Sequence, residues 1–590
     1  MTDGDFAKPD DGLSRSRLAE KQHPAAIRAF QRLSKRPLIG RPGPLDGDRD
    51  VRAVPTPTPS GWTILPSPLH WIPIAAALLI SAGAALRLIQ YGAQRSLWLD
   101  EAMLAVNIGG RSFRELLAPL DYEQIAPPLF LWAERTLLLL GGADEWTLRA
   151  LPVLAGILLP VLTWILARRL LPATWALLAV ALVAFSPTLI RFSNEVKPYS
   201  MDAAVGAALV LLALDLGRAP ERGTHWWRLG AAGVLSIAVS AGAIFVLVAI
   251  LLALVVAEPM RKRIGWMKRL APMGSAWALT FVVLYLGVYH RSSSSAYMAA
   301  FWESGFIRPF QSDSALRLWN AIHGVLSSLF LGTLSPSRWG TAVGYATGVQ
   351  AAFAAILIGI GFSMVARRRS LTEALLLAGP IAVPFIASAL GLYPVNIRLV
   401  LFAVPGLAIL LAAGVPRFLA ALPGRARGMA LLASVGFLLG PALLRDAIEA
   451  LHPHHRQETR PLVTALAREG EPSEPVYVSA AAIPAWLFYT TDWSAPDRER
   501  LRWFAVQAGS SGPAFHSRIS RGRPVRKEGF NLVRSDGVRP EIVGIPTGQR
   551  HLTPSGGLGL SDRPDPGWAE NEARRIRGAA PSAVWVLFVP

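Results

Sequence analysis

Long apolar runs separated by short polar stretches fill the chain from about residue 70 to residue 445. A run of about 18 or more apolar residues is long enough to cross a bilayer as a helix. The run at 230–256 is too long for one crossing and is interrupted by Ser240-Ala241-Gly242, so it predicts two short helices. With these two, the pattern predicts about eleven crossings. The predicted runs are 71–88, 151–167, 171–190, 203–216, 230–256, 277–288, 343–365, 375–392, 399–415 and 429–444.

The polar regions divide the rest of the chain. Residues 1–68 are rich in Pro, Gly and basic residues, a composition that predicts a disordered tail. Residues 90–148 predict a long first outer loop, in which 111–119 and 128–140 read as short amphipathic helices. Residues 290–340 predict a long polar loop. Residues 446–590 have the composition of a soluble domain. The pattern there predicts buried strands at 476–479 and 584–589 and a helix at 481–489.

These patterns predict an all-α polytopic membrane bundle with a small C-terminal α/β domain, divided into residues 1–68, 69–445 and 446–590. Charged residues make up 17% of the chain, compared with about 25% in ordinary soluble domains. The formal net charge of +19 is concentrated in Lys and Arg clusters at the ends of apolar runs, which is typical of topology signals rather than of nucleic-acid binding. The clusters place the N-terminus in the cytoplasm and the C-terminal domain outside the inner cell membrane. The absence of cysteine excludes disulfides and thiolate chemistry.

Candidate chemistry lies in three of the predicted outer segments. Asp100 and Glu101 stand side by side in the first loop, Glu195 and Lys197 in the second, and Arg398 before a late helix. Acids beside a membrane are costly unless a cation or a substrate proton uses them. Lys197 and Arg398 oppose the charge bias of the outer face, so each requires an anion, for which an interfacial phosphate is suitable. The set predicts transfer of a group from a lipid-linked phosphate.

In that reaction Lys197, Arg398 or a divalent metal stabilises the leaving phosphate, and Asp100 is the base for an attacking hydroxyl. Direct displacement with one base inverts the anomeric centre. Other interpretations remain open: adjacent acids are often solvated or cap helices, and Lys197 and Arg398 also fit headgroup contacts. The cluster at 452–455, with three histidines, fits an exposed linker better than a metal site. The interrupted run at 230–256 favours a lipid-linked-sugar transporter or flippase, and a non-catalytic scaffold is a third class.

Five motifs carry a family resemblance over about residues 70–450. They are SLWLDEA, QIAPPLF, LGGADEWTLRALPVLAG, FSNEVKPYSMDAAV and YPVNIRLVLFAVPGLAIL. With these motifs the chain resembles GT-C glycosyltransferases of the dolichyl-phosphate-mannose protein mannosyltransferase type, which include the bacterial lipid A aminoarabinose and galacturonosyl transferases.

The resemblance implies an integral membrane transferase that uses a polyprenyl-phosphate sugar at the outer face. It places Asp100 and Glu101 at the catalytic position, and Lys197, Tyr199 and Arg398 at the donor phosphate. It also admits a divalent metal (Mg, Mn, Ca or Zn), with Asp100 and Glu195 as candidate ligands. Many relatives have Arg where this chain has Lys197. The expected partners are the donor, a lipid, glycan or protein acceptor, and membrane lipids, with no nucleic acid; the sequence does not identify the sugar.

Overall fold

The computed structural model describes residues 71–256, 259–290, 296–331, 336–453, 455–469, 476–479, 482–499 and 501, and beyond these a few short strands and single residues. The predicted N-terminal tail lies outside the described residues. The helices of the first half are α2 (Trp71–Gly92), α3 (Leu99–Gly110), α4 (Pro128–Gly141), α5 (Glu145–Leu170), α6 (Ala173–Ala184), α7 (Pro187–Phe192), α8 (Tyr199–Arg218), α9 (Gly223–Val239), α10 (Ala243–Val256) and α11 (Met260–Leu284). Those of the second half are α13 (Ala296–Phe301), α14 (Ser314–Leu331), α15 (Pro336–Arg368), α16 (Leu371–Ala389), α17 (Val404–Ala420), α18 (Gly424–Leu451), α19 (Thr459–Glu469) and α20 (Ile483–Thr490).

Short helical turns join these elements. Five are of the 3₁₀ type and one is a π turn: η1 (Glu115–Leu117), η2 (Asp121–Glu123), η3 (Tyr285–Tyr289, π), η4 (Glu303–Gly305), η5 (Ile397–Leu399) and η6 (Leu401–Ala403). The strands are β1 (Val476–Ser479), β2 (Val533–Arg534), β3 (Pro540–Gly544), β4 (Arg550–Leu552), β5 (Leu558–Leu560) and β6 (Trp585–Leu587).

The predicted membrane character is confirmed. In the described part of the chain, eight helices are long and apolar enough to cross a membrane: α2, α5, α8, α11 (with η3), α15, α16, α17 and α18. The helices α6 and α10 are apolar but shorter. The sequence pattern predicts about eleven crossings, two of them short helices. The described residues contain these eight long candidates and two shorter apolar helices, so the number of crossings stays a prediction.

Individual elements agree with or differ from their predictions for local reasons. The run at 230–256 is two helices, α9 and α10, as predicted, whereas 171–190 is also divided, into α6 and α7, at Ser186-Pro187. Residues 111–119 form only the turn η1, so the amphipathic helix predicted there is wrong. The predicted polar loop 290–340 contains the helices α13 and α14 and the start of α15. Helix α4 begins with Pro128 at its first turn, a position where proline's missing N–H costs nothing.

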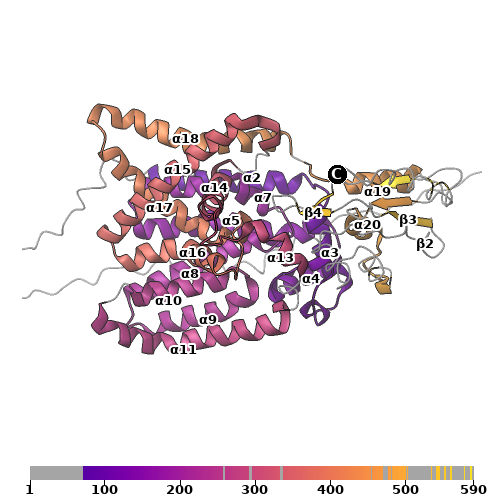
Figure 1. Ribbon diagram of the computed structural model, residues 1–590, viewed down its shortest axis with the longest axis horizontal. Helices are drawn as coiled ribbons and strands as arrows, with labels where there is room; N and C mark the ends of the chain where they lie inside the picture. The colour runs from indigo at the N-terminus through magenta and orange to yellow at the C-terminus, as the bar shows by residue number, and fades with distance from the viewer. Residues whose placement is uncertain are drawn as a thin grey trace, which may run out of the picture. The chain divides into compact units, whose positions relative to one another are not determined.

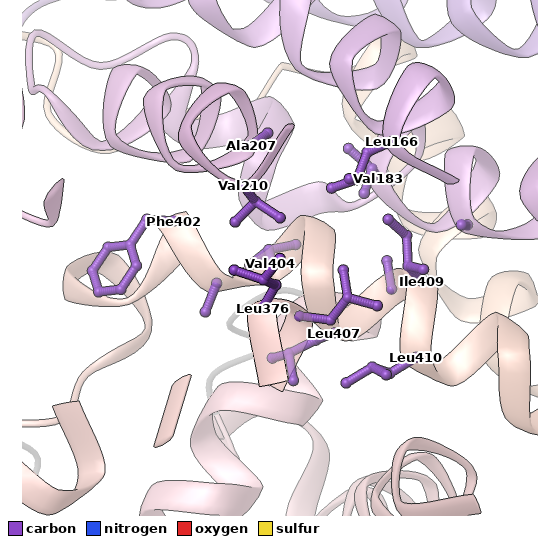
Figure 2. Packing of buried hydrophobic residues seen from close by; sticks show 14 of the residues in the cluster. Leu166, Val183, Ala207, Val210, Leu376, Phe402, Val404, Leu407, Ile409 and Leu410 are labelled. Atoms are coloured by element: carbon purple, nitrogen blue, oxygen red, sulfur yellow. The ribbon is translucent and has the colours of Figure 1, made fainter. Parts of the chain in front are cut away.

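The helix α17 lies at the centre of the bundle and is the most buried of the eight apolar helices. Its side chains Val404, Leu407 and Ile409 pack with residues of α6, α8 and α16 (Figure 2). Glycine lets α15 approach α17 closely: a Cβ atom on Gly414 would lie 2.0 Å from the Leu357 carbonyl oxygen. Small residues at such crossings let helices pack by backbone contact, the usual means of association inside a bilayer. At one edge of the bundle α9, α10 and α11 pack against one another (Figure 1).

A buried arginine fixes the break after α6. Arg87 of α2 is completely buried and donates hydrogen bonds to the carbonyl oxygens of Val183 (3.2 Å) and Ala184 (2.9 Å). These are among the last carbonyls of α6, which lack partners within their own helix. The charge on Arg87 thus satisfies a helix end in an apolar environment, and the chain turns into α7 toward the loop that carries Glu195 and Lys197.

The C-terminal strands form a small sheet in the order β2-β3-β1-β6, in which β1 pairs in parallel with both β3 and β6. Strands lie at both predicted places, 476–479 and within 584–589, and α20 lies within two residues of the predicted helix. The side chains Val478, Trp486 and Leu587 belong to the same hydrophobic cluster as Leu104 and Phe130 of the first loop. Helix α20 lies beside α3 (Figure 1), so this part of the C-terminal region shares a core with the loop that carries Asp100.

Candidate active site

Three distant segments bring one carboxylate between two cations. Asp100 lies in the first turn of α3, Lys197 in the loop between α7 and α8, and Arg398 in η5. The Lys197 Nζ atom lies 3.0 Å from Asp100 Oδ1, and Arg398 Nη1 lies 3.4 Å from Asp100 Oδ2. The Asp100 side chain is 22% exposed and that of Lys197 7%, so the pair lies at a partly accessible edge rather than in a sealed core.

These charges determine the protonation state of Asp100. Burial alone would raise the pKa of its carboxyl, but the charges of Lys197 and Arg398 and hydrogen bonds from Lys197 and Gln124 outweigh burial. The pKa of Asp100 therefore lies below its ordinary value. The position in the first turn of α3 acts in the same direction, because a helix N-terminus favours negative charge. Asp100 is ionised at neutral pH.

Lys197 has a second partner from the first loop. Its Nζ atom donates to the Oε1 atom of Gln124 at 2.6 Å. Gln124 is the first residue of the QIAPPLF motif, just before the two prolines that start α4. The ammonium group is a point charge with three donors, so it serves Asp100 and Gln124 and retains one donor direction.

Arg398 rests on an aromatic pair from a different loop. Its guanidinium carbon lies 4.6 Å from the centre of the Trp302 ring and 5.9 Å from that of Phe301. Burial lowers the pKa of Arg398, but Tyr199, Asp100 and Glu195 outweigh it and raise the pKa above its ordinary value. Tyr199 is the first residue of α8, and its place at the donor phosphate stays a prediction.

Glu101 is fully engaged in contacts with α5 and with the loop between α7 and α8. It is 1% exposed, and its two oxygens accept from Arg149 Nε at 2.8 Å and Nη2 at 2.6 Å. Its Oε1 also accepts the backbone N–H of Val196 at 2.9 Å, next to Lys197. Such a buried bidentate pair leaves Glu101 no free oxygen to act as a base. The geometry thus places Glu101 in a buried ion pair that joins α3 to α5, whereas the resemblance implies a catalytic position for it beside Asp100.

Glu195 lies beside two arginines that do not contact Asp100. It is 3% exposed; its Oε1 atom lies 2.9 Å from Arg191 Nε and 3.9 Å from Arg456 Nη1. The Oε2 atom makes no hydrogen bond within the described residues. The guanidinium of Arg456 also stacks on Trp98, 4.4 Å from the ring centre. Glu195 thus faces cations, as Asp100 does, but different ones.

The donor set does not fit a divalent metal. Among the described residues, no group of three His, Cys, Asp or Glu side chains is placed to hold an ion. Both oxygens of Asp100 face Lys197 or Arg398, and Glu195 faces Arg191 and Arg456. Cations at these positions would repel a divalent ion, and they supply the positive charge that such an ion would bring. In the histidine cluster, His455 is exposed and pairs with Glu458, while His454 lies outside the described residues.

Several residues of the site were missed by the sequence analysis, among them Gln124, Arg149, Trp302 and Arg456. Gln124 and Arg149 stand inside motifs that were noted, and the cost of burying Glu101 was a signal that a basic partner was needed. Trp302 and Arg456 lie in segments without a distinguishing pattern. Their contacts with Arg398 and Trp98 arise only from tertiary packing.

Part of this site lies in a segment that matches a known protein family. Residues 126–287 match the family described as dolichyl-phosphate-mannose-protein mannosyltransferase. The match confirms the resemblance predicted from the sequence and relates this segment to a class of membrane glycosyltransferases. The matched segment includes Arg149, Glu195 and Lys197, but ends before Arg398 and begins after Asp100 and Gln124. None of the curated protein sequences matches the chain.

Solved structures give a weaker likeness. The ArnT protein from Cupriavidus metallidurans bound to undecaprenyl phosphate is 15% identical, with a TM-score of 0.45, over 80% of this chain and 98% of that one. An oligosaccharyltransferase from Archaeoglobus fulgidus in the apo form is 14% identical, with a TM-score of 0.46, over 71% of this chain. The present chain spans 63% of that protein. At these scores the likeness does not establish a common fold.

Proposed function

We propose that this protein is an inverting glycosyltransferase that moves a sugar from a polyprenyl-phosphate donor to an acceptor hydroxyl at the outer face of the membrane. The observation that carries the proposal is the ion-paired group of Asp100, Lys197 and Arg398, drawn from segments 97 and 298 residues apart in the chain. The match of residues 126–287 to a mannosyltransferase family supports the same reaction class.

Each charged group has a chemical task in this reaction. Asp100 takes the proton of the acceptor hydroxyl, whose oxygen forms a bond to the anomeric carbon. The bond between that carbon and the phosphate oxygen breaks, and its electron pair leaves on the phosphate. Lys197 and Arg398 stabilise the negative charge that develops there. One displacement inverts the anomeric configuration.

The shared cations link donor binding to the basicity of Asp100. In the free protein, Lys197 and Arg398 hold the pKa of Asp100 low, which makes this carboxylate a weak base. A donor phosphate bound to the same two cations offsets their positive charge. The pKa of Asp100 then rises, so the base is strengthened only when the sugar donor is in place.

The alternative function, transport of a lipid-linked sugar, was favoured by the interrupted run at 230–256. In the structure, the chain passes from α9 to α10 through residues 240–242, and a Cβ atom on Gly242 would lie 2.2 Å from the Phe402 ring. Glycine at this position lets the backbone approach Phe402 closely. The break therefore has a structural explanation that does not require transport.

The test is a transfer assay with purified protein in proteoliposomes and a panel of radiolabelled polyprenyl-phosphate sugars. We expect one donor to be consumed, and the Asp100→Asn variant to lose at least about 100-fold in kcat with donor binding retained. The matched control is Asp121→Asn, which removes a carboxylate of the same loop that pairs with Arg111.

Full activity of Asp100→Asn would remove Asp100 from the mechanism. Movement of a fluorescent lipid-linked sugar across the liposome membrane, with no transfer from any donor, would instead favour the transporter.

A further inference from the structure

We infer that Gln457, Arg460 and Tyr489, from the part of the chain after the last apolar helix, are positioning residues for Asp100. They hold residues 94–99, the segment that joins α2 to α3 and leads directly into Asp100. The inference rests on the proposed function. It gives this part of the C-terminal region a role in the reaction that differs from binding the acceptor.

Tyr489 of α20 joins two parts of the first loop through its hydroxyl group. The hydroxyl donates to Glu145 Oε1 at 2.6 Å and accepts the backbone N–H of Leu97 at 2.8 Å. Burial and the neighbouring charge of Glu145 raise the pKa of Tyr489, so its hydroxyl stays protonated and remains a donor. One side chain therefore fixes the backbone three residues before Asp100.

Gln457 caps α3 from outside the helix. Its Oε1 atom accepts the backbone N–H of Leu99, the first residue of α3, at 2.6 Å. The first N–H groups of a helix have no partner within it, and a side-chain oxygen is the usual solution. The residue before α3 is Trp98, whose indole ring has no oxygen to offer. Gln457 supplies the missing acceptor one residue before Asp100.

Arg460 holds the start of the same segment. Its Nη2 atom donates to the Gln94 carbonyl oxygen at 2.6 Å, and its Nη1 atom lies 3.0 Å from Glu145 Oε1. Gln94 has a φ of 44°, a left-handed conformation that is unfavourable for residues other than glycine. Such conformations persist where the surroundings impose them. Arg460 is thus one of the contacts that keep this segment in a conformation it would not adopt alone.

The position of the segment matters because Asp100 works at short range. Its oxygens lie 3.0 Å from Lys197 and 3.4 Å from Arg398. A displacement of about 1 Å of a catalytic group can cost roughly 100-fold in rate. Loss of the anchors at Leu97 and Leu99 would let the first turn of α3 move away from the two cations, while the donor phosphate could still bind them.

The experiment uses two variants of the full-length protein in proteoliposomes, Tyr489→Phe and Gln457→Leu. Tyr91→Phe is the matched control, because it removes a tyrosine hydroxyl whose hydrogen bond, at 2.8 Å to the Trp146 carbonyl oxygen, lies outside residues 94–99. We expect kcat to fall about ten-fold in both variants with the KM for each substrate nearly unchanged. The acidic limb of the pH profile should move to higher pH, because Asp100 leaves the cations that lower its pKa. Gln457→Glu, which keeps an acceptor oxygen, should recover most of the lost kcat.

Hydrogen exchange provides a second measurement that needs no activity. The amide of Leu97 should exchange faster in Tyr489→Phe than in Tyr91→Phe, and the amide of Leu99 should exchange faster in Gln457→Leu, because each amide loses its acceptor. Unchanged exchange, or faster exchange with wild-type kcat and pH profile, would overturn the positioning role. A raised acceptor KM with unchanged kcat would also overturn it, in favour of acceptor binding. If the wild-type protein transfers no sugar from any donor while exchange responds as expected, the proposed function fails but the anchoring of residues 94–99 stands.

Discussion

At the scale of single residues, two cations of the site share one carboxylate. Lys197 and Arg398 converge on Asp100, but they reach it by different means. Lys197 is a point charge that Gln124 also binds, whereas Arg398 presents a planar group that stacks on Trp302. This difference explains why Lys at position 197 is compatible with a phosphate role, since an ammonium binds a phosphate without needing the geometry of a bidentate fork.

Replacing Lys197 by Met should move the pH dependence of transfer in a defined direction. Lys197 lowers the pKa of Asp100, so its removal raises that pKa. Activity requires the ionised carboxylate and is lost as the carboxylate gains a proton. The acidic limb of kcat/KM for the donor should therefore appear at higher pH, together with a loss of activity of about 100-fold from weaker phosphate stabilisation.

Lys268→Met, on the exposed side of α11, is the control for removing a lysine. An acidic limb that stays at its wild-type position in the Lys197 variant would show that Lys197 does not act on the catalytic base.

At the scale of elements, backbone contact between helices holds the centre of the bundle. Gly414 of α17 faces the Leu357 carbonyl of α15, and Gly361 of α15 faces the Leu410 carbonyl of α17. A Cβ atom at position 361 would lie 1.8 Å from that oxygen. The two glycines are reciprocal, so each helix contacts the backbone of the other at a glycine.

Gly414→Ala should therefore destabilise the protein, although alanine is the better helix former. The added methyl group forces α15 and α17 apart, and overpacking of this kind costs about 1–3 kcal/mol. Gly436→Ala on α18 is the matched control, because a Cβ atom there meets nothing within 4 Å. Thermal unfolding in detergent should show a lower Tm for the first variant and an equal or higher Tm for the second. Equal Tm values in both would contradict the tight crossing.

At the scale of the whole molecule, part of the C-terminal region packs against the first loop. They share the hydrophobic cluster that contains Leu104, Phe130 and Trp486, and Arg498 lies 3.2 Å from Glu115. Two segments that pack in this way lie on the same side of a membrane. The basic end of α15, at Arg367 and Arg368, is the kind of cluster that the positive-inside rule assigns to the cytoplasm.

Single cysteines in this cysteine-free chain should report this arrangement. Arg114→Cys and Ser494→Cys, both exposed, should react from the same side with a maleimide that cannot cross membranes, and Arg368→Cys from the opposite side. Proteoliposomes of known orientation and lysed vesicles give the two reference levels. Labelling of Arg114→Cys and Ser494→Cys from opposite sides would be incompatible with their shared core.

Sequence alone determined the membrane character, the approximate places of the eight long apolar helices, the strand at 476–479 and a strand within 584–589, and the candidates Asp100, Lys197 and Arg398. These follow from local quantities: the length of an apolar run, the turn residues around it, and the cost of placing a charge beside a membrane. Tertiary structure alone decided that Glu101 is taken by Arg149, that Arg398 rests on Trp302, and that Tyr489 and Gln457 hold the segment before Asp100. Each of these contacts joins residues far apart in the chain, and their pairing depends on how the helices pack, which no local pattern records.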